Sequence, residues 1–142
     1  FINSNSVNTP RALLLIEHCT SIQLERLMTA EATIENLVLR YFQSWQEPAD
    51  LEEFRACLAD NVVFDSPFGK VDGADALTEM VRNTEAPWEG VTLLTSTFDA
   101  NSGALFYDGI DSKTGARMRV GEHLRVHGGQ IDYITAAICR LD

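Results

Sequence analysis

ARMRVGEHLRVH, residues Ala116–His127, separates into two faces when it is read at the two-residue period of a β-strand. One face carries the basic side chains Arg117, Arg119, His123, Arg125 and His127. The other carries Met118, Val120, Leu124 and Val126, with Glu122 among them. Because an ionised carboxylate is costly to bury, a buried Glu122 must gain partners or take up a proton at a raised pKa. This pattern predicts a strand that lines a ligand pocket.

Glu122 also has a simpler interpretation. A β-bulge at Gly121 would turn its carboxylate outward, where it would pair with a neighbouring arginine. From this strand alone both interpretations stand, and they differ in whether Glu122 meets solvent or a cavity.

The bulk composition is that of one soluble globular domain. The chain has 142 residues, 45% of them hydrophobic and 23% charged. Its formal net charge of −10 argues against nucleic acid or an anionic membrane surface as a partner. The cysteines Cys19, Cys57 and Cys139 form no CxxC pair, so we expect free thiols in a cytoplasmic protein. No apolar run is long enough to span a membrane.

The first half of the chain predicts helices. They are expected over residues 10–28, 29–45, 51–58 and 72–83. The first is expected to break near Thr20, and Asp50 with Glu53 gives the third a capping-box-like start. Residues 1–28 are therefore expected to form a tail and an extra helix, which precede the main domain at residues 29–142.

The second half changes to a period of two. After a brief strand at 61–65, strands are expected over residues 91–98, 104–110, 116–127 and 130–140. Their short connections predict an antiparallel meander. Helices followed by strands indicate an α+β fold in which helices cover one face of a curved sheet.

Three stretches carry a resemblance to a known family: Arg40-Tyr41-Phe42, residues 63–69 (VFDSPFG) with the following VDG, and the closing meander. Over residues 29–141 the chain resembles the nuclear-transport-factor-2-like and SnoaL-like superfamily. The resemblance implies a cone-shaped, cystatin-like barrel, with a curved, mainly antiparallel sheet around three helices. It also implies a homodimer formed through the open sheet face. The superfamily includes isomerases, dehydratases, epoxide hydrolases, polyketide cyclases and binding modules, so the fold does not fix a reaction.

The closest local resemblance is to ketosteroid isomerase. It implies that Tyr41 is the oxyanion-hole tyrosine and that Glu122 takes the place of the family's protonated Asp. The family's catalytic Asp stands immediately before Pro-Phe-Gly, where this chain has Ser66. Asp65 stands one residue earlier, so its side chain is expected on the opposite face of the strand.

The last strand offers another base. Asp132 shares its parity with Ile134, Ala136 and Ile138, which places it beside Glu122 as a carboxylate pair. The limonene-epoxide-hydrolase branch of the superfamily bridges two carboxylates with an arginine. In this chain Arg119 falls on the strand face opposite Glu122.

We therefore predict a pocket between the sheet and its helices, suited to a small, largely apolar molecule. Its expected apolar lining is Leu37, Phe42, Phe64, Phe68, Leu77, Val120, Leu124, Ile134 and Ile138, with Trp45 or Trp88 near the mouth. The extra N-terminal helix is expected to pack over the pocket entrance or against a second subunit.

The first functional hypothesis is a cofactor-independent isomerase, cyclase or hydratase, either ketosteroid-isomerase-like or polyketide-cyclase-like. Neutral Glu122 and the Tyr41 hydroxyl would donate to a carbonyl oxygen, while Asp132 or, as the weaker candidate, Asp65 moves the proton. The alternatives are a non-catalytic ligand-binding or dimerisation module and an epoxide-hydrolase-like enzyme. No metal is expected, because His123 and His127 would lie roughly 13 Å apart on a strand.

Overall fold

The computed structural model describes residues 11–84 and 88–141, with side chains from Thr20 onward. Its helices are α1 (Arg11–Ser44), α2 (Leu51–Cys57) and α3 (Ala74–Asn83). None of the helices in these ranges is long and apolar enough to cross a membrane.

Helix α1 is continuous over 34 residues, so the expected break near Thr20 is wrong and the two helices expected over residues 10–28 and 29–45 form one helix. The stretch around Thr20 contains no Gly or Pro, and the low helix propensities of Thr and Ser cost only a few tenths of a kcal/mol per residue. Farther along, the hydroxyls of Thr29 and Thr33 donate to the carbonyls of Glu25 and Thr29, at 2.8 and 2.9 Å. Both hydroxyls therefore find acceptors within the helix, and the helix continues past them.

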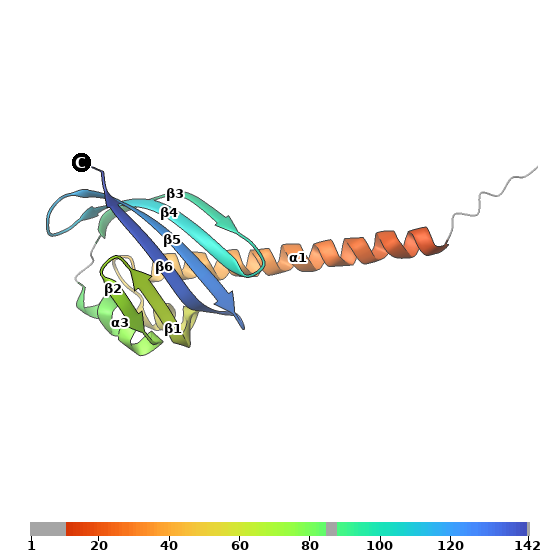
Figure 1. The fold of residues 1–142 in the computed structure, drawn as a ribbon, viewed down its shortest axis with the longest axis horizontal. Coiled ribbons are helices and arrows are strands. Elements are labelled where there is room, and N and C mark those ends of the chain that lie inside the picture. Colours follow the sequence, from red (N-terminus) through yellow and green to blue (C-terminus); the bar gives the residue numbers. More distant parts are fainter. Residues whose placement is uncertain (1–10, 85–87, 142) are drawn as a thin grey trace, which may run out of the picture.

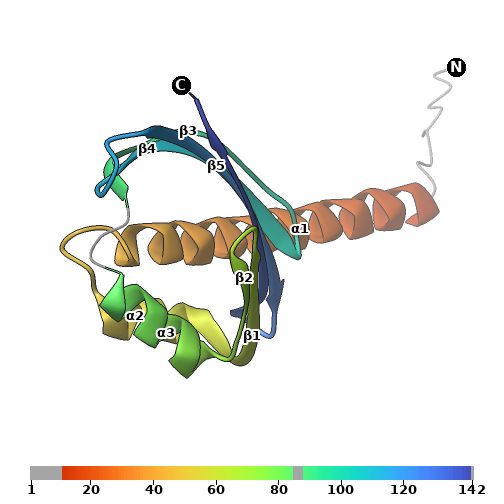
Figure 2. The same cartoon turned by 60° about the vertical axis from the view of Figure 1, so that its left-hand side comes forward.

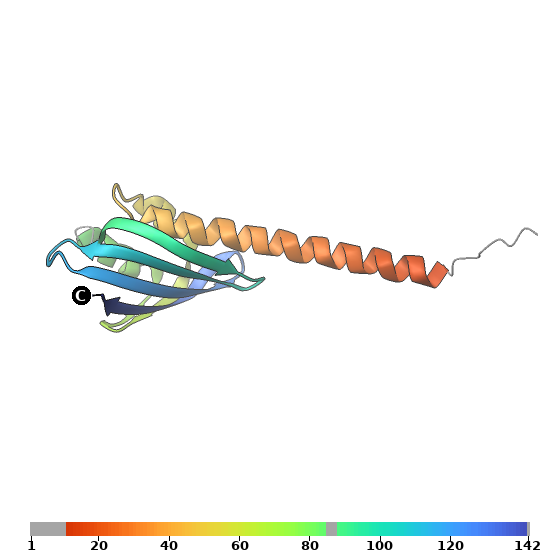
Figure 3. The ribbon, with the colours of Figure 1, turned by 90° about the horizontal axis from the view of Figure 1, so that it is seen from above.

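The N-terminal part of α1 projects away from the domain (Figures 1 and 3). Its apolar residues Ile22, Leu24, Leu27 and Met28 are exposed. The expectation that this segment covers the pocket entrance is therefore wrong. Contact with a second subunit stays a prediction.

Six strands form one curved sheet in the order β2-β1-β6-β5-β4-β3. The strands are β1 (Leu58–Ser66), β2 (Gly69–Asp72), β3 (Trp88–Phe98), β4 (Ser102–Asp111), β5 (Arg117–His127) and β6 (Gln130–Arg140). Neighbours pair antiparallel except β1 with β6. The predicted meander and the α+β class are confirmed, whereas β2, which pairs with β1 across a tight turn, was not expected.

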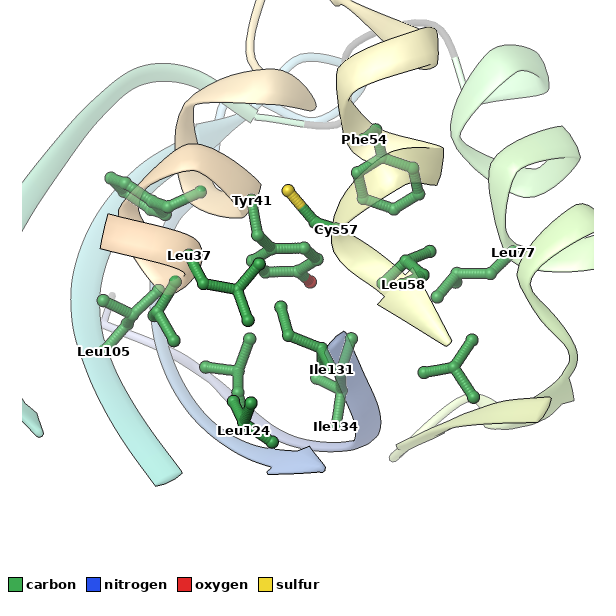
Figure 4. Close-up of a cluster of buried hydrophobic side chains, with 14 of the residues drawn as sticks. Leu37, Tyr41, Phe54, Cys57, Leu58, Leu77, Leu105, Leu124, Ile131 and Ile134 are labelled. Atoms are coloured by element: carbon green, nitrogen blue, oxygen red, sulfur yellow. The ribbon is translucent and has the colours of Figure 1, made fainter. Parts of the chain in front are cut away.

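The sheet curves around the C-terminal half of α1, and α2 and α3 lie across the open side (Figure 2). Buried residues of α1 follow helical spacing at Ile34, Leu37, Val38, Tyr41 and Phe42. They meet side chains from α2, α3 and the sheet in the core, including Phe54, Leu58, Leu124 and Ile134 (Figure 4). At the start of α2, the Glu53 N–H donates to Asp50 at 3.0 Å, as the capping pattern predicted. The packing of the core holds α1 against β4 and β3.

Candidate functional site

A cavity of about 330 Å³ lies between the sheet and the helices. It is lined by Tyr41, Trp45, Phe54, Phe64, Ser66, Phe68, Leu77, Met80, Val81, Thr84, Trp88, Tyr107, Glu122 and Ile138. Most of these side chains are apolar, and a few polar groups stand among them. A cavity of this size and chemistry suits a small, largely apolar ligand.

Glu122 faces this cavity from the middle of the sheet. Strand β5 pairs regularly with both neighbours through Gly121, which lies opposite Phe106 on β4 and Ala137 on β6. The alternative of a bulge at Gly121 is therefore wrong. The alternation predicted for this strand holds here, and it leaves Glu122 only 6% exposed.

The two oxygens of Glu122 have different surroundings. Oε1 accepts a hydrogen bond from the Tyr107 hydroxyl at 3.3 Å, whereas Oε2 is buried without a hydrogen-bond partner. A buried carboxyl oxygen without a partner is unfavourable unless the group is protonated or a ligand satisfies it. Oε2 is therefore the atom through which Glu122 can act on a bound molecule.

Burial raises the pKa of Glu122 to about 7, although the hydrogen bond from Tyr107 and the neighbouring Tyr41 hydroxyl lower it. The pKa values of both tyrosines are raised, first by burial and then by the Glu122 charge. The tyrosines consequently stay protonated and can donate at any ordinary pH. The carboxyl group can gain or lose its proton near neutrality, which suits general acid–base chemistry.

Tyr41 and Glu122, predicted together, both line the cavity. Tyr41 is 3% exposed, and its ring packs against Phe54 with centroids 5.5 Å apart. Tyr107, which is 2% exposed, completes the polar group and was missed. Tyr107 lies on the adjacent strand β4, opposite Val120, and Val120 is two residues before Glu122 on β5. Pairing the strand ends expected at 110 and 116 would have placed Tyr107 opposite Arg119, one residue from its actual partner, and so on the wrong face.

Asp132 does not join this group. Val126 pairs with Ile131 and Arg125 pairs with Tyr133, so Asp132 is the extra residue of a bulge in β6. Its carboxylate instead accepts two hydrogen bonds from Arg125, at 2.8 and 3.2 Å. The expected placement beside Glu122 is wrong because the bulge changes the parity on which it rested.

Asp65 also lies outside the cavity lining. It accepts a hydrogen bond from the Tyr133 hydroxyl at 3.1 Å, and Lys70 is 3.8 Å away. Its neighbour Ser66 does line the cavity, but its hydroxyl serves the β1–β2 turn. That hydroxyl donates to the Gly69 carbonyl and accepts from the Phe68 N–H, both at 3.2 Å.

The expected apolar lining is correct in part. Phe64, Phe68, Leu77 and Ile138 line the cavity, as do both tryptophans, Trp45 and Trp88. The remaining expected lining residues, Leu37, Phe42, Val120, Leu124 and Ile134, are buried in the core instead. They do not line the cavity because they pack against one another and their neighbours where α1 meets the sheet. The residues missed are Phe54, Met80, Val81 and Thr84, of which the last three continue the helical spacing from Leu77.

An arginine between two carboxylates, as epoxide hydrolysis would require, is not found among the described lining residues. Arg119 binds Asp108 through two hydrogen bonds at 2.7 and 2.9 Å. Glu122 is the one carboxyl group among the described residues that line the cavity.

A family model described as the SnoaL-like domain matches residues 38–134. Similar solved structures include a protein from Kribbella flavida DSM 17836, with 27% identity, a TM-score of 0.64, and coverage of 74% of this chain and 84% of that one. A candidate ketosteroid isomerase from the same organism has 20% identity, a TM-score of 0.67, and coverage of 80% and 79%.

A candidate polyketide cyclase from Xanthomonas campestris pv. campestris has 18% identity, a TM-score of 0.61, and coverage of 76% and 91%. No protein with a curated description matches the chain. At these identities, the isomerase and the cyclase show the fold alone.

Proposed function

This chain belongs to the SnoaL-like domain family, and we propose that it binds a small, largely apolar carbonyl compound and moves a proton on it without a cofactor. One observation carries the proposal. The buried Oε2 of Glu122 has no partner and belongs to a residue that lines an apolar cavity together with two tyrosines. A carbonyl compound would fill the apolar space and give these polar groups a partner.

In the proposed reaction, ionised Glu122 is the base. Its Oε2 takes a proton from the carbon beside the carbonyl, and the electrons of the broken C–H bond move toward the carbonyl oxygen to give an enolate. Tyr41 donates a hydrogen bond to that oxygen as the negative charge develops. In a carbonyl compound with a β,γ double bond, return of the proton from Glu122 to the γ-carbon moves the double bond into conjugation and regenerates the carboxylate. In a carbonyl compound without that double bond, the proton returns to the same carbon, and the step is seen as hydrogen exchange.

This proposal changes the role of Glu122 from neutral donor to base. The change follows from the position of Asp132, which is bound to Arg125 outside the cavity. A pKa of about 7 supports the role, because a substantial fraction of Glu122 is then ionised at neutral pH. The names of two structural neighbours, an isomerase and a cyclase, fit carbonyl chemistry of this kind.

Binding without turnover is the second candidate. Ser66 favours it, because a serine stands where the resemblance implies the catalytic base. In this case neutral Glu122 would donate through Oε2 to a ligand oxygen. Affinity would then be highest below about pH 7, where the carboxyl keeps its proton.

Deuterium exchange into α-tetralone tests the proposal. The ketone is incubated with the protein in deuterated buffer, and loss of its α-proton signal is followed by NMR. We expect exchange above the buffer rate that increases as the pH rises through about 7, because the base must be ionised. The variant Glu122→Gln should lose this exchange, whereas Asp132→Asn, a matched change outside the cavity, should keep it.

Two results would contradict the proposal. Binding of α-tetralone without exchange at any pH would favour the non-catalytic candidate. Exchange that survives in Glu122→Gln would remove the base from this position.

A further inference from the structure

The cavity wall contains a second buried polar atom without a partner, Nε1 of Trp45. The indole N–H is only a donor, so an acceptor must satisfy it. A buried donor without an acceptor is unfavourable, and such groups are rare in native proteins. The proposed reaction does not use Trp45.

Trp45 and Glu122 contact different parts of Tyr107. The Trp45 ring packs against the Tyr107 ring with centroids 5.7 Å apart, whereas Glu122 accepts a hydrogen bond from the Tyr107 hydroxyl. Trp45 is also held edge-on by Phe42, with centroids 5.5 Å apart. The two unsatisfied atoms therefore belong to separate segments, the turn directly after α1 and strand β5, and their residues contact the ring and the hydroxyl of the same tyrosine.

The charge of the wall restricts what the Trp45 N–H can bind. No Lys or Arg is found among the described residues that line the cavity, and Glu122 becomes negative above about pH 7. An anionic group would lose its hydration without gaining a cation, which is unfavourable. The fitting acceptor is a neutral oxygen, such as an ether, hydroxyl or second carbonyl.

We infer that Trp45 makes the site selective for apolar ring compounds that carry a second, neutral oxygen acceptor in addition to the carbonyl at Glu122. The inference rests on the proposed function, since it assumes that the carbonyl end of the ligand lies at Glu122 and Tyr41. It assigns to Trp45 the binding of the other oxygen.

Matched derivatives of α-tetralone test this inference. Each ring position is substituted either with methoxy or with ethyl, which have the same number of heavy atoms and differ by one oxygen. Dissociation constants are measured by isothermal titration calorimetry. We expect at least one methoxy isomer to bind about five to ten times more tightly than its ethyl counterpart, the effect of one hydrogen bond.

Trp45→Phe keeps an aromatic ring and removes the N–H. It should abolish the preference for methoxy while leaving the affinity for the ethyl compound within about twofold. Trp88→Phe, a change at the other indole of the wall, should keep the ratio of the two affinities.

Equal binding of methoxy and ethyl compounds at every position, or a preference that survives Trp45→Phe, would overturn the inference. If α-tetralone still binds and exchanges deuterium through Glu122, the proposed function survives that result. Failure of all tetralones to bind would overturn both.

Discussion

Replacing Glu122 with Gln should change how the stability of the protein depends on pH. In the unfolded chain the Glu122 carboxyl loses its proton near its ordinary pKa of 4.5, whereas in the folded protein it keeps the proton until about pH 7. Between these values the unfolded state binds fewer protons, so the free energy of unfolding falls as the pH rises. The contribution is fully present below about pH 4.5 and is lost as the pH rises through about 7.

The size of the effect follows from the two pKa values. A rise from 4.5 to about 7 in a fully buried group corresponds to about 3 kcal/mol. Urea unfolding, followed by circular dichroism at several values between about pH 4 and pH 9, measures it. The free energy of unfolding of the wild type, relative to Glu122→Gln, should fall by about 3 kcal/mol across this range.

Glu89→Gln is the matched control, because Glu89 is an exposed glutamate on β3. The free energy of unfolding of Glu89→Gln should change with pH in the same way as that of the wild type. Parallel curves for the wild type and Glu122→Gln would refute the reasoning, since Glu122 would then titrate alike in the folded and unfolded states.

Three other variants test separate parts of the account. Tyr107→Phe removes a hydrogen bond that lowers the pKa of Glu122, so the pH midpoint of deuterium exchange into α-tetralone should move above about 7. An unchanged midpoint would contradict this role of the hydrogen bond. Val81→Phe should fill the cavity and weaken the binding of α-tetralone, measured by calorimetry, about tenfold or more. The circular dichroism spectrum should stay unchanged. An unaltered affinity would place the ligand elsewhere. A chain beginning at Thr29 lacks the exposed apolar residues of α1, so light scattering should show fewer subunits per particle while the domain stays folded. An unchanged number of subunits would argue against a subunit contact through α1.

The position of Glu122 could be predicted because β5 pairs regularly on both sides between Arg117 and Arg125. Regular pairing preserves the alternation of side chains, so the period of two assigned Glu122 to the inner face. The same argument failed for Asp132, because one extra residue in β6 reverses the parity. Nothing in the residues around Asp132 marks that bulge, which arises from pairing between strands.

Periodicity also could not separate cavity lining from core. Leu124 and Ile134 face inward as predicted, yet both are fully buried against the helices. Which inward residues keep free space beside them depends on where α1 and α3 approach the sheet. Tyr107 could not be assigned to the inner face from the sequence, because the strand ends expected at 110 and 116 pair it with Arg119, one residue from its actual partner Val120.

The central claim is that Glu122 is buried at the cavity and exchanges its proton near neutral pH. The most direct test is a titration of its side-chain carboxyl carbon by NMR, with the signal assigned by its absence in Glu122→Gln. We predict a midpoint of about 7. A midpoint near the ordinary value of 4.5 would show a solvated carboxylate and contradict the account.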